Sequence, residues 1–290
     1  MTPAPASPHY VLALTCRDAP GIVHAVAGFL VEQQCTIVQS QQFGDSETGG
    51  FFLRTQFVQF DGQPVDVIAL QHRFTQVADR FAMSWQLIDA SRRQRVLILV
   101  SRSGHCLNDL LFRTSVGDLN IDVVAVVSNH PDLGRLTSRF GVPFRHIPVA
   151  PDTAAKAEAE LLELIVDERV DLVVLARYMQ ILSDDLCKQL EGRVINIHHS
   201  MLPSFKGARP YHQAFARGVK VIGATAHYVT ADLDEGPIIE QELMRVDHSM
   251  SADELVAHGR EVECRTLARA VRWHTANRVL LNRKKTVVLR

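Results

Sequence analysis

The chain has 290 residues, of which 47% are hydrophobic and 22% are charged, and its formal net charge is −1. These values are typical of a globular protein with a sizeable core, and the length allows one large domain or two modest ones. A net charge close to zero gives no electrostatic reason to expect a nucleic-acid partner. No stretch is long and apolar enough to span a membrane, and the first ten residues lack the basic leader and apolar run of a secretory signal.

Five cysteines are scattered along the chain without a CxxC spacing. An odd number of unclustered cysteines favours reduced thiols over a disulfide framework or a zinc site. Together with the lack of a secretory signal, this pattern predicts a cytoplasmic protein. The cysteines are Cys16, Cys35, Cys106, Cys187 and Cys264.

The first part of the chain predicts a small α/β domain at 9–90, preceded by a disordered tail at 1–8 that is rich in Pro, Ala and Ser. Apolar residues recur at helical spacing after residue 22 and again between 70 and 81, and strand-like runs stand around them. The expected strands are 10–15, 36–42, 51–60 and 83–88. The order βαββαβ is that of a ferredoxin-like unit.

A polar, charged linker is expected at 91–95, followed by a larger domain at 96–290. Several of its runs are apolar on both faces, as the strands of a parallel sheet covered by helices must be. The expected strands are 96–100, 121–127, 172–175, 194–197, 219–229 and 238–246. The expected helices are 108–114, 133–140, 154–167 and 252–277, with a further helix starting at Ser183 and a loop through 203–210. This alternation predicts a Rossmann-like, mainly parallel sheet, and therefore an α/β protein of two domains.

The most informative stretch is NIHHSMLPSFKG, residues 196–207, at the end of an apolar strand. Residues i and i+2 of a strand point to the same face, so we expect Asn196 and His198 to share one face at the carboxyl end of the strand. Open α/β sheets place their sites at such ends. A second cluster follows with His227 and Asp234. An amide donor, imidazoles and a carboxylate can stabilise an oxyanion and transfer protons in a reaction at a carbonyl group.

These two stretches resemble the folate-dependent formyltransferases, a family with an Asn-x-His motif followed by a later His and an Asp-x-Gly. The resemblance is carried by NIHHSMLPSFKGA and GATAHYVTADLDEGPII and extends over almost the whole chain. His199 stands where transferring members usually have proline, and this variant resembles a hydrolytic branch of the family. The opening of the first domain, DAPGIV at 18–23, resembles the ACT domain, a regulatory module that often binds amino acids at a subunit interface.

The resemblance implies hydrolysis of 10-formyltetrahydrofolate to formate and tetrahydrofolate, which would supply formate for purine synthesis and balance the one-carbon folate pools. Asn196, His198 and Asp234 are the matching catalytic positions, with Asp234 either activating or positioning the water. The folate is the substrate, and neither a cofactor nor a metal ion is expected. The matching substrate-binding positions are Met179, Gln180, Ile181, Leu182, His199, His227 and Lys206.

The segment SRSGHC, residues 101–106, departs from the ribonucleotide-binding members of the family, which have a glycine-rich phosphate loop at this place. One glycine remains, and the bulky Arg102 and His105 leave little room for a ribonucleotide. Without an acceptor amine, water becomes the acceptor. Formyl transfer to glycinamide ribonucleotide stays the alternative within the family, whereas formylation of methionyl-tRNA is disfavoured because the neutral chain shows no appended basic domain.

Two alternatives come from other classes. His198, His199, His227 and Asp234 could be drawn as a zinc site, but neighbouring strand residues point to opposite faces and no HExxH motif is present. A non-catalytic folate or amino-acid sensor would not require the full set of Asn196, His198 and Asp234. The ACT-like domain further implies an amino-acid effector and a homo-oligomer, because such domains often pair edge to edge.

Overall fold

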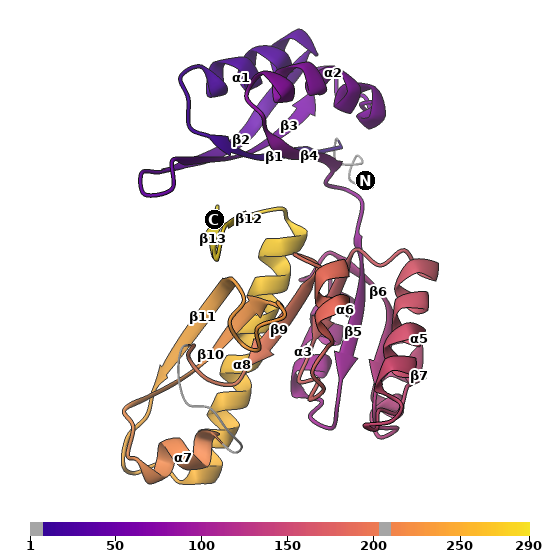
Figure 1. Ribbon diagram of the computed structural model, residues 1–290, viewed down its shortest axis with the longest axis vertical. Helices are drawn as coiled ribbons and strands as arrows, with labels where there is room; N and C mark the ends of the chain where they lie inside the picture. The colour runs from indigo at the N-terminus through magenta and orange to yellow at the C-terminus, as the bar shows by residue number, and fades with distance from the viewer. Residues whose placement is uncertain (1–7, 203–209) are drawn as a thin grey trace, which may run out of the picture. The chain divides into compact units, whose positions relative to one another are not determined.

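The computed structural model describes residues 8–202 and 210–290, which form two compact units (Figure 1). The first unit contains 8–93 together with 276–290, and the second contains the described residues of 94–275. The boundary falls inside the linker expected at 91–95, because the first strand of the second unit already begins at Gln94. The disordered tail expected at 1–8 lies, apart from Pro8, outside the described residues.

The first unit is a four-stranded antiparallel sheet with two helices on one face (Figure 1). The strand order β2-β3-β1-β4 places β1 in the interior of the sheet, which explains its unbroken apolar run. The ring of Phe74 packs edge-on against Phe29 and Trp85 beneath the helices. The βαββαβ prediction is confirmed by the elements β1 (Tyr10–Arg17), α1 (Ile22–Glu32), β2 (Cys35–Asp45), β3 (Gly50–Gln59), α2 (Val67–Arg80) and β4 (Ser84–Asp89).

The end of the chain returns to the first unit as a hairpin, β12 (Val279–Asn282) and β13 (Lys285–Val288). The second domain expected at 96–290 is therefore too long by its last residues, 276–290. The physical reason is apolar burial, since the hairpin covers part of the sheet of the first unit. The residues of the sheet and of the end of the chain that are buried together in this way are Val11, Ala13, Phe52, Leu280 and Leu289.

The second unit contains a seven-stranded sheet of order β11-β10-β9-β8-β5-β6-β7, in which β10 pairs antiparallel with both of its neighbours and the other pairs are parallel. The Rossmann-like, mainly parallel sheet is thus confirmed. Its strands are β5 (Gln94–Val100), β6 (Ile121–Ser128), β7 (Phe144–His146), β8 (Leu172–Leu175), β9 (Val194–His198), β10 (Val221–Tyr228) and β11 (Ile238–Arg245). Its helices are α3 (His105–Ser115), α4 (Gly134–Ser138), α5 (Ala154–Asp167), α6 (Asp184–Gln189), α7 (Pro210–Ala216) and α8 (Ala252–Thr275).

Two of these elements were not expected from the sequence. Strand β7 has three residues, too few for an alternating pattern to show. Helix α7 begins in a stretch that we predicted as a loop. Tertiary packing accounts for it, because the ring of Tyr211 lies against Gly259 of α8, where a Cβ atom would come within 2.1 Å of the ring. A glycine inside a long helix, costly for helix propensity, here makes room for an aromatic ring.

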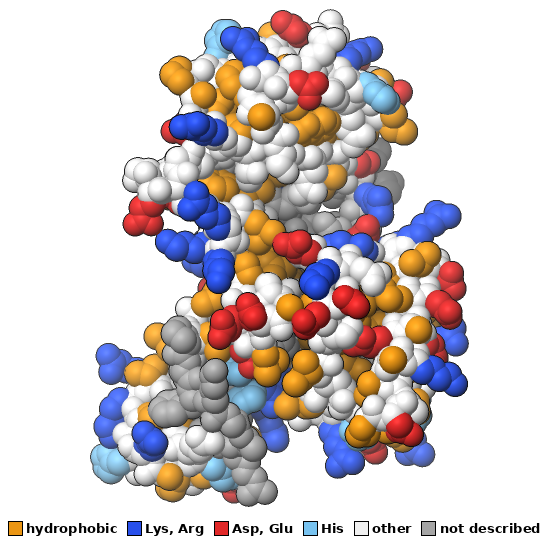
Figure 2. All heavy atoms as spheres, viewed as in Figure 1, with side chains coloured by type: hydrophobic (Ala, Val, Ile, Leu, Met, Phe, Trp, Pro, Cys, Tyr) orange, Lys and Arg blue, Asp and Glu red, His pale blue; other side chains and the backbone are white. Residues whose placement is uncertain are grey.

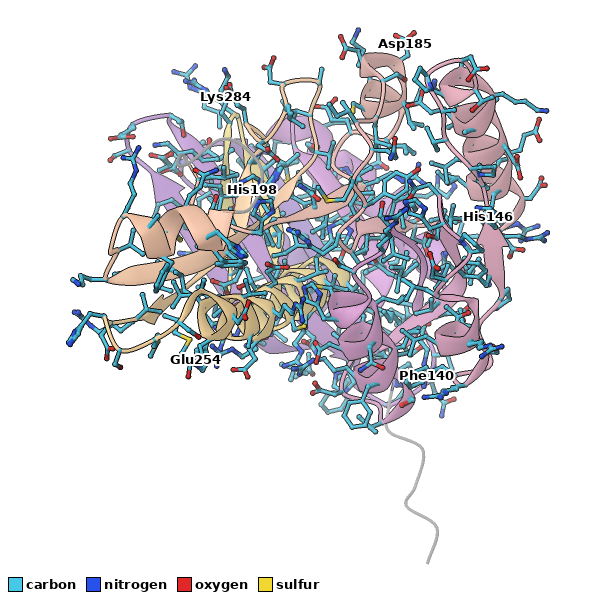
Figure 3. The ribbon with its side chains drawn as sticks, turned by 90° about the horizontal axis from the view of Figure 1, so that it is seen from below. Phe140, His146, Asp185, His198, Glu254 and Lys284 are labelled. Carbon is cyan, nitrogen blue, oxygen red and sulfur yellow. The ribbon has the colours of Figure 1, made fainter. Side chains whose placement is uncertain are left out.

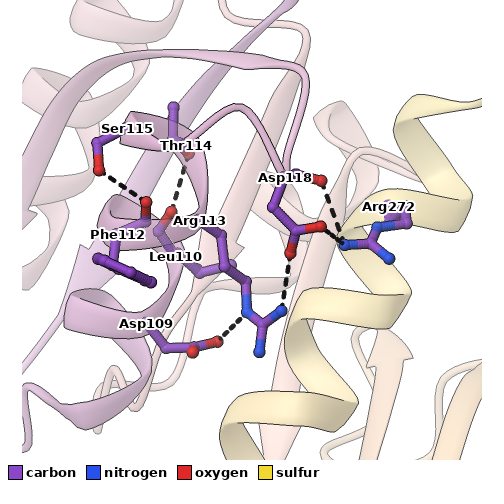
Figure 4. Close-up of polar contacts among 8 residues, drawn as sticks. All are labelled: Asp109, Leu110, Phe112, Arg113, Thr114, Ser115, Asp118 and Arg272. Atoms are coloured by element: carbon purple, nitrogen blue, oxygen red, sulfur yellow. Dashed lines mark hydrogen bonds and ion pairs between the residues drawn. The ribbon is translucent and has the colours of Figure 1, made fainter.

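Helices α3 and α8 are joined at the surface by a chain of ion pairs (Figure 4). Arg272 of α8 donates to the carboxylate of Asp118 at 2.7 Å, and Arg113 of α3 donates to the same carboxylate at 2.8 Å. Arg113 also pairs with Asp109 one helical turn earlier, at 2.7 Å. All four side chains are partly exposed, so we expect the chain of pairs to contribute no more than about 1 kcal/mol to stability.

Charged side chains of both signs are interspersed over the face drawn in Figure 2, without an extended surface of one sign. This distribution agrees with the net charge of −1 and offers no broad basic surface for nucleic acid on that face. Among the described residues, no helix has the length and apolar character needed to cross a membrane.

A half-buried histidine predicts an acid-sensitive fold. Tyr228 Oη and His274 Nδ1 lie 2.7 Å apart, and burial lowers the pKa of His274 to about 4 from the ordinary 6.5. Between these two pH values the unfolded chain binds more protons than the folded chain, so the free energy of unfolding falls as the pH is lowered from 6.5 towards 4. Between about pH 7 and pH 5, we expect the free energy of unfolding, measured with urea, to fall by about 1–2 kcal/mol less in His274→Gln than in the unaltered protein. His24→Gln, at an exposed position, is the control, and an equal loss in both variants would contradict the prediction.

Candidate active site

A cavity of about 530 Å³ opens at the carboxyl ends of β8 and β9. It contains the predicted catalytic residues together with the predicted folate-binding segment. Figure 3 labels His198, which is the last residue of β9. The lining residues are Leu175, Arg177, Tyr178, Met179, Gln180, Ile181, Leu182, Cys187, Asn196, Ile197, His198, His199, Leu202, His227, Val229, Thr230, Ala231, Leu233, Asp234 and Glu235.

Strand pairing brings the two sequence clusters together. Strand β9 pairs with the antiparallel strand β10 so that Asn196 lies opposite His227 and His198 opposite Thr225. Side chains of directly opposed residues share a face, and Asn196 Nδ2 donates to His227 Nε2 at 3.3 Å. The expectation that Asn196 and His198 line one site is met, since both face the same cavity. Tertiary pairing thus joins an amide and an imidazole that are 31 residues apart.

Asp234 completes the cluster from the loop between β10 and β11. Its Oδ1 atom lies 3.2 Å from His198 Nδ1 and 3.7 Å from His227 Nε2. The hydrogen bond from His198 holds the pKa of Asp234 well below its usual range, so the group is a carboxylate at neutral pH. The residue has a φ of 58°, a left-handed conformation that Asp tolerates better than most residues.

The hydrogen bonds also fix the ring tautomers. The backbone oxygen of Tyr228 can only accept, so His227 Nδ1 donates to it at 2.8 Å and Nε2 is left to accept from Asn196. His198 presents Nδ1 to Asp234, and its Nε2 atom is buried without a hydrogen-bond partner among the described residues. A buried polar atom without a partner is costly, and a ligand in the cavity can supply one. His198 Nε2 is therefore the atom we expect to face a substrate.

The segment after β8 forms one side of the cavity and contains four of the residues expected to bind the substrate, Met179, Gln180, Ile181 and Leu182. The backbone nitrogen of Met179 donates to Ser101 Oγ at 2.9 Å, which ties the segment to the end of β5. Met179 and Ile181 are 62% and 74% exposed. Leu233, on the loop that carries Asp234, is 61% exposed and lines the same cavity. Large apolar side chains exposed around one cavity are typical of a site for a flat aromatic ligand.

His199 corrects one step of the sequence reasoning. Strand β9 ends at His198, so the alternation of faces no longer applies to the next residue, and the rings of His198 and His199 stack with their centroids 4.9 Å apart. Arg177 Nη1 donates to His199 Nδ1. Burial, followed by the charges of Arg177 and His198, lowers the pKa of His199 to about 4. His199 is therefore neutral at pH 7 and carries its proton on Nε2.

The structure contains a different set of metal-type ligands from the one drawn on the sequence. Within residues 8–202 and 210–290, the group close enough to share an ion is His105, Cys106 and Glu263, with ligating atoms within 4.8 Å of one another. The guanidinium group of Arg177 lies 3.5 Å from the Glu263 carboxylate and opposes a cation there. Lys206, predicted to meet the substrate, lies outside the described residues.

Comparisons with known proteins identify the family of this chain. A family model described as formyl transferase matches residues 94–271. The formyltetrahydrofolate deformylase of Corynebacterium sp. (strain P-1) is 55% identical over 281 residues, which are 97% of this chain and 98% of that protein. The chain belongs to the formyltetrahydrofolate deformylase family. The crystal structure of the formyltetrahydrofolate deformylase of Burkholderia mallei covers 98% of this chain and 100% of its own, with 50% identity and a TM-score of 0.94.

The transferring relatives match less of this deformylase-family chain. The glycinamide ribonucleotide transformylase 1 of Symbiobacterium toebii covers 68% of it, with 32% identity and a TM-score of 0.63, although the match includes 95% of the transformylase chain. The resemblance to folate-dependent formyltransferases, and to their hydrolytic branch, is confirmed. Eleven of the twenty lining residues are not among the predicted site positions. They include Arg177 and Tyr178, which lie outside the two quoted motifs, and Leu202 and Leu233, which lie within them but have no polar group to mark them. The glycine-like φ of Arg177, 66°, has no signal in the sequence.

Proposed function

We propose that this protein hydrolyses 10-formyltetrahydrofolate to formate and tetrahydrofolate. The observation that carries the proposal is the convergence of Asn196, His198 and Asp234 in one cavity beside an apolar wall. Membership in the deformylase family supports the same activity. A protein that only bound the folate would need the wall but not a carboxylate against an imidazole whose other nitrogen faces the cavity.

The chemistry follows from the positions of the polar atoms. Water adds to the formyl carbon and gives a proton to His198 Nε2, while Asp234 holds the Nδ1–H of the same ring and the second N–H of the Asn196 amide stabilises the developing oxyanion. His198 then delivers a proton to N10 as the C–N bond breaks, which releases formate and tetrahydrofolate. Asp234, with its strongly lowered pKa, is a weak base. We therefore assign it to holding the water and orienting His198 rather than to taking the proton outright.

We propose that the reaction needs neither a metal ion nor a cofactor, because the polar atoms of the chain can supply each step. The release of formate would supply purine synthesis and balance the one-carbon folate pools. The first unit, with its βαββαβ order, fits an amino-acid effector site of the ACT type and pairing of units in a homo-oligomer. The cytoplasmic location expected from the unpaired cysteines stays a prediction.

The test is formate release from 10-formyltetrahydrofolate by the purified full-length protein. We expect formate and tetrahydrofolate in equal amounts without any acceptor, and an unchanged rate after treatment with EDTA. Parallel reactions contain glycinamide ribonucleotide. Product that forms only with the ribonucleotide would replace our proposal by a formyltransferase, and loss of activity after chelation would show that a metal ion takes part.

A further inference from the structure

Arg177 occupies a backbone position that favours glycine. Its φ of 66° lies in the left-handed region, where a residue with a Cβ atom is strained. The position is fixed from outside the segment, because the backbone nitrogen of Ser101 donates to the backbone oxygen of Arg177 at 3.1 Å. A side chain as large as Arg at such a position must make contacts that compensate for the strain.

Those contacts form a buried network centred on Glu263 of α8. Glu263 is 1% exposed, and its carboxylate meets His105 Nε2 at 2.7 Å and Tyr211 Oη at 2.7 Å. The Arg177 guanidinium lies 3.5 Å from the same carboxylate and donates to His199. Burial by itself raises the pKa of Glu263, but the hydrogen bond from His105 and the charge of Arg177 bring it below the usual range. The network is therefore a paired cation and anion rather than a neutral cluster.

This network stands between two hollows of the second unit. Arg177 and His199 line the cavity that holds the catalytic residues. His105 lines a separate open groove of about 500 Å³ between α3 and α8, whose other walls include Arg260 and Cys264. Glu263 contacts residues of both hollows and is itself buried, so it forms part of the wall that separates them.

We propose that Arg177, held by Glu263, excludes amine acceptors from the formyl carbon and so determines that water is the acceptor. A transferase needs space beside the formyl group for the substrate that receives it, and in this chain Arg177 lines the cavity with its guanidinium group held against Glu263 and His199. Arg177 is thus a specificity-determining residue, and Glu263 positions it. The inference rests on the proposed hydrolysis of 10-formyltetrahydrofolate.

Removal of the arginine side chain should admit a small amine. The formyl carbon then leaves N10 and bonds to the amine nitrogen, and the proton that the amine loses ends on N10, so that the products are a formamide and tetrahydrofolate. Glycinamide is a suitable probe because it offers a primary amine without a ribose or phosphate. The measured quantity is the ratio of formylglycinamide to formate at a fixed glycinamide concentration, which a general loss of stability does not change.

We expect Arg177→Gly to raise this ratio about tenfold or more over the unaltered protein. Glycine suits the φ of this position, so the variant should fold, and thermal unfolding checks this. Arg177→Lys, which keeps a cation and most of the bulk, should restore a ratio near that of the unaltered protein. Arg135→Ala is the matched control, since Arg135 of α4 is exposed and does not line the cavity. Glu263→Gln should raise the ratio to an intermediate value by releasing the guanidinium group.

The proposal would be overturned if folded Arg177→Gly gave the same ratio as Arg135→Ala. If Arg177→Gly fails to fold, an unchanged ratio in Glu263→Gln would overturn it instead. Failure of the proposed function has a different signature, because the unaltered protein would then release no formate in the absence of glycinamide.

Discussion

Asp234→Asn is expected to reduce formate release by about 10²- to 10⁴-fold while folate binding stays within about twofold. The amide keeps the size of the carboxylate but loses the charge that faces His198 Nδ1 at 3.2 Å and His227 Nε2 at 3.7 Å. The variant therefore leaves the apolar wall intact and removes the group that orients the imidazole and the water. Single-turnover formate release measures the chemical step, and quenching of protein fluorescence by tetrahydrofolate measures binding.

Asp232→Asn is the control for this prediction, because Asp232 lies on the same loop with an exposed side chain. It should release formate at the rate of the unaltered protein. The opposite result would be that Asp234→Asn binds folate more weakly but releases formate from bound substrate at an unchanged rate. Asp234 would then bind the substrate and would not act in the reaction.

Gly236→Ala is expected to lower the free energy of unfolding by about 2–3 kcal/mol and to reduce formate release more than about tenfold. A Cβ atom at Gly236 would come within 1.7 Å of the backbone oxygen of Tyr228, and backbone cannot give way as a flexible side chain can. The backbone nitrogen of Tyr228 also donates to the backbone oxygen of Pro237 at 2.9 Å. To relieve the clash, the loop must move away from β10, which carries Asp234 away from His198 and His227.

Urea unfolding and formate release, both at a temperature where the variant is folded, test the two parts of this expectation. Gly28→Ala is the matched control, since Gly28 lies in helix α1 and a Cβ atom added there would meet no atom within 4 Å. Alanine there should be neutral or stabilise by about 0.5–1 kcal/mol. Full stability of Gly236→Ala would mean that the loop adjusts freely, and that close packing does not place Asp234.

Local sequence pattern determined most of the fold. Apolar periodicity identified both helices of the first unit and the long helices α5 and α8, because a buried face repeats at helical spacing regardless of what covers it. Elements that depend on distant partners were missed. The hairpin β12–β13 and helix α7 are short, and their burial against β1 and α8 decides their structure rather than their own propensity.

The same division holds for the site. The sequence by itself identified Asn196, His198 and Asp234 as the candidate catalytic residues, since they stand in motifs whose residue types suit a reaction at a carbonyl group. Only the tertiary structure decided their distances, because strand pairing sets Asn196 opposite His227 and a glycine contact places the loop of Asp234. It alone also revealed Arg177 and its buried partner Glu263, since residues so far apart in the chain meet only through folding and leave no local pattern.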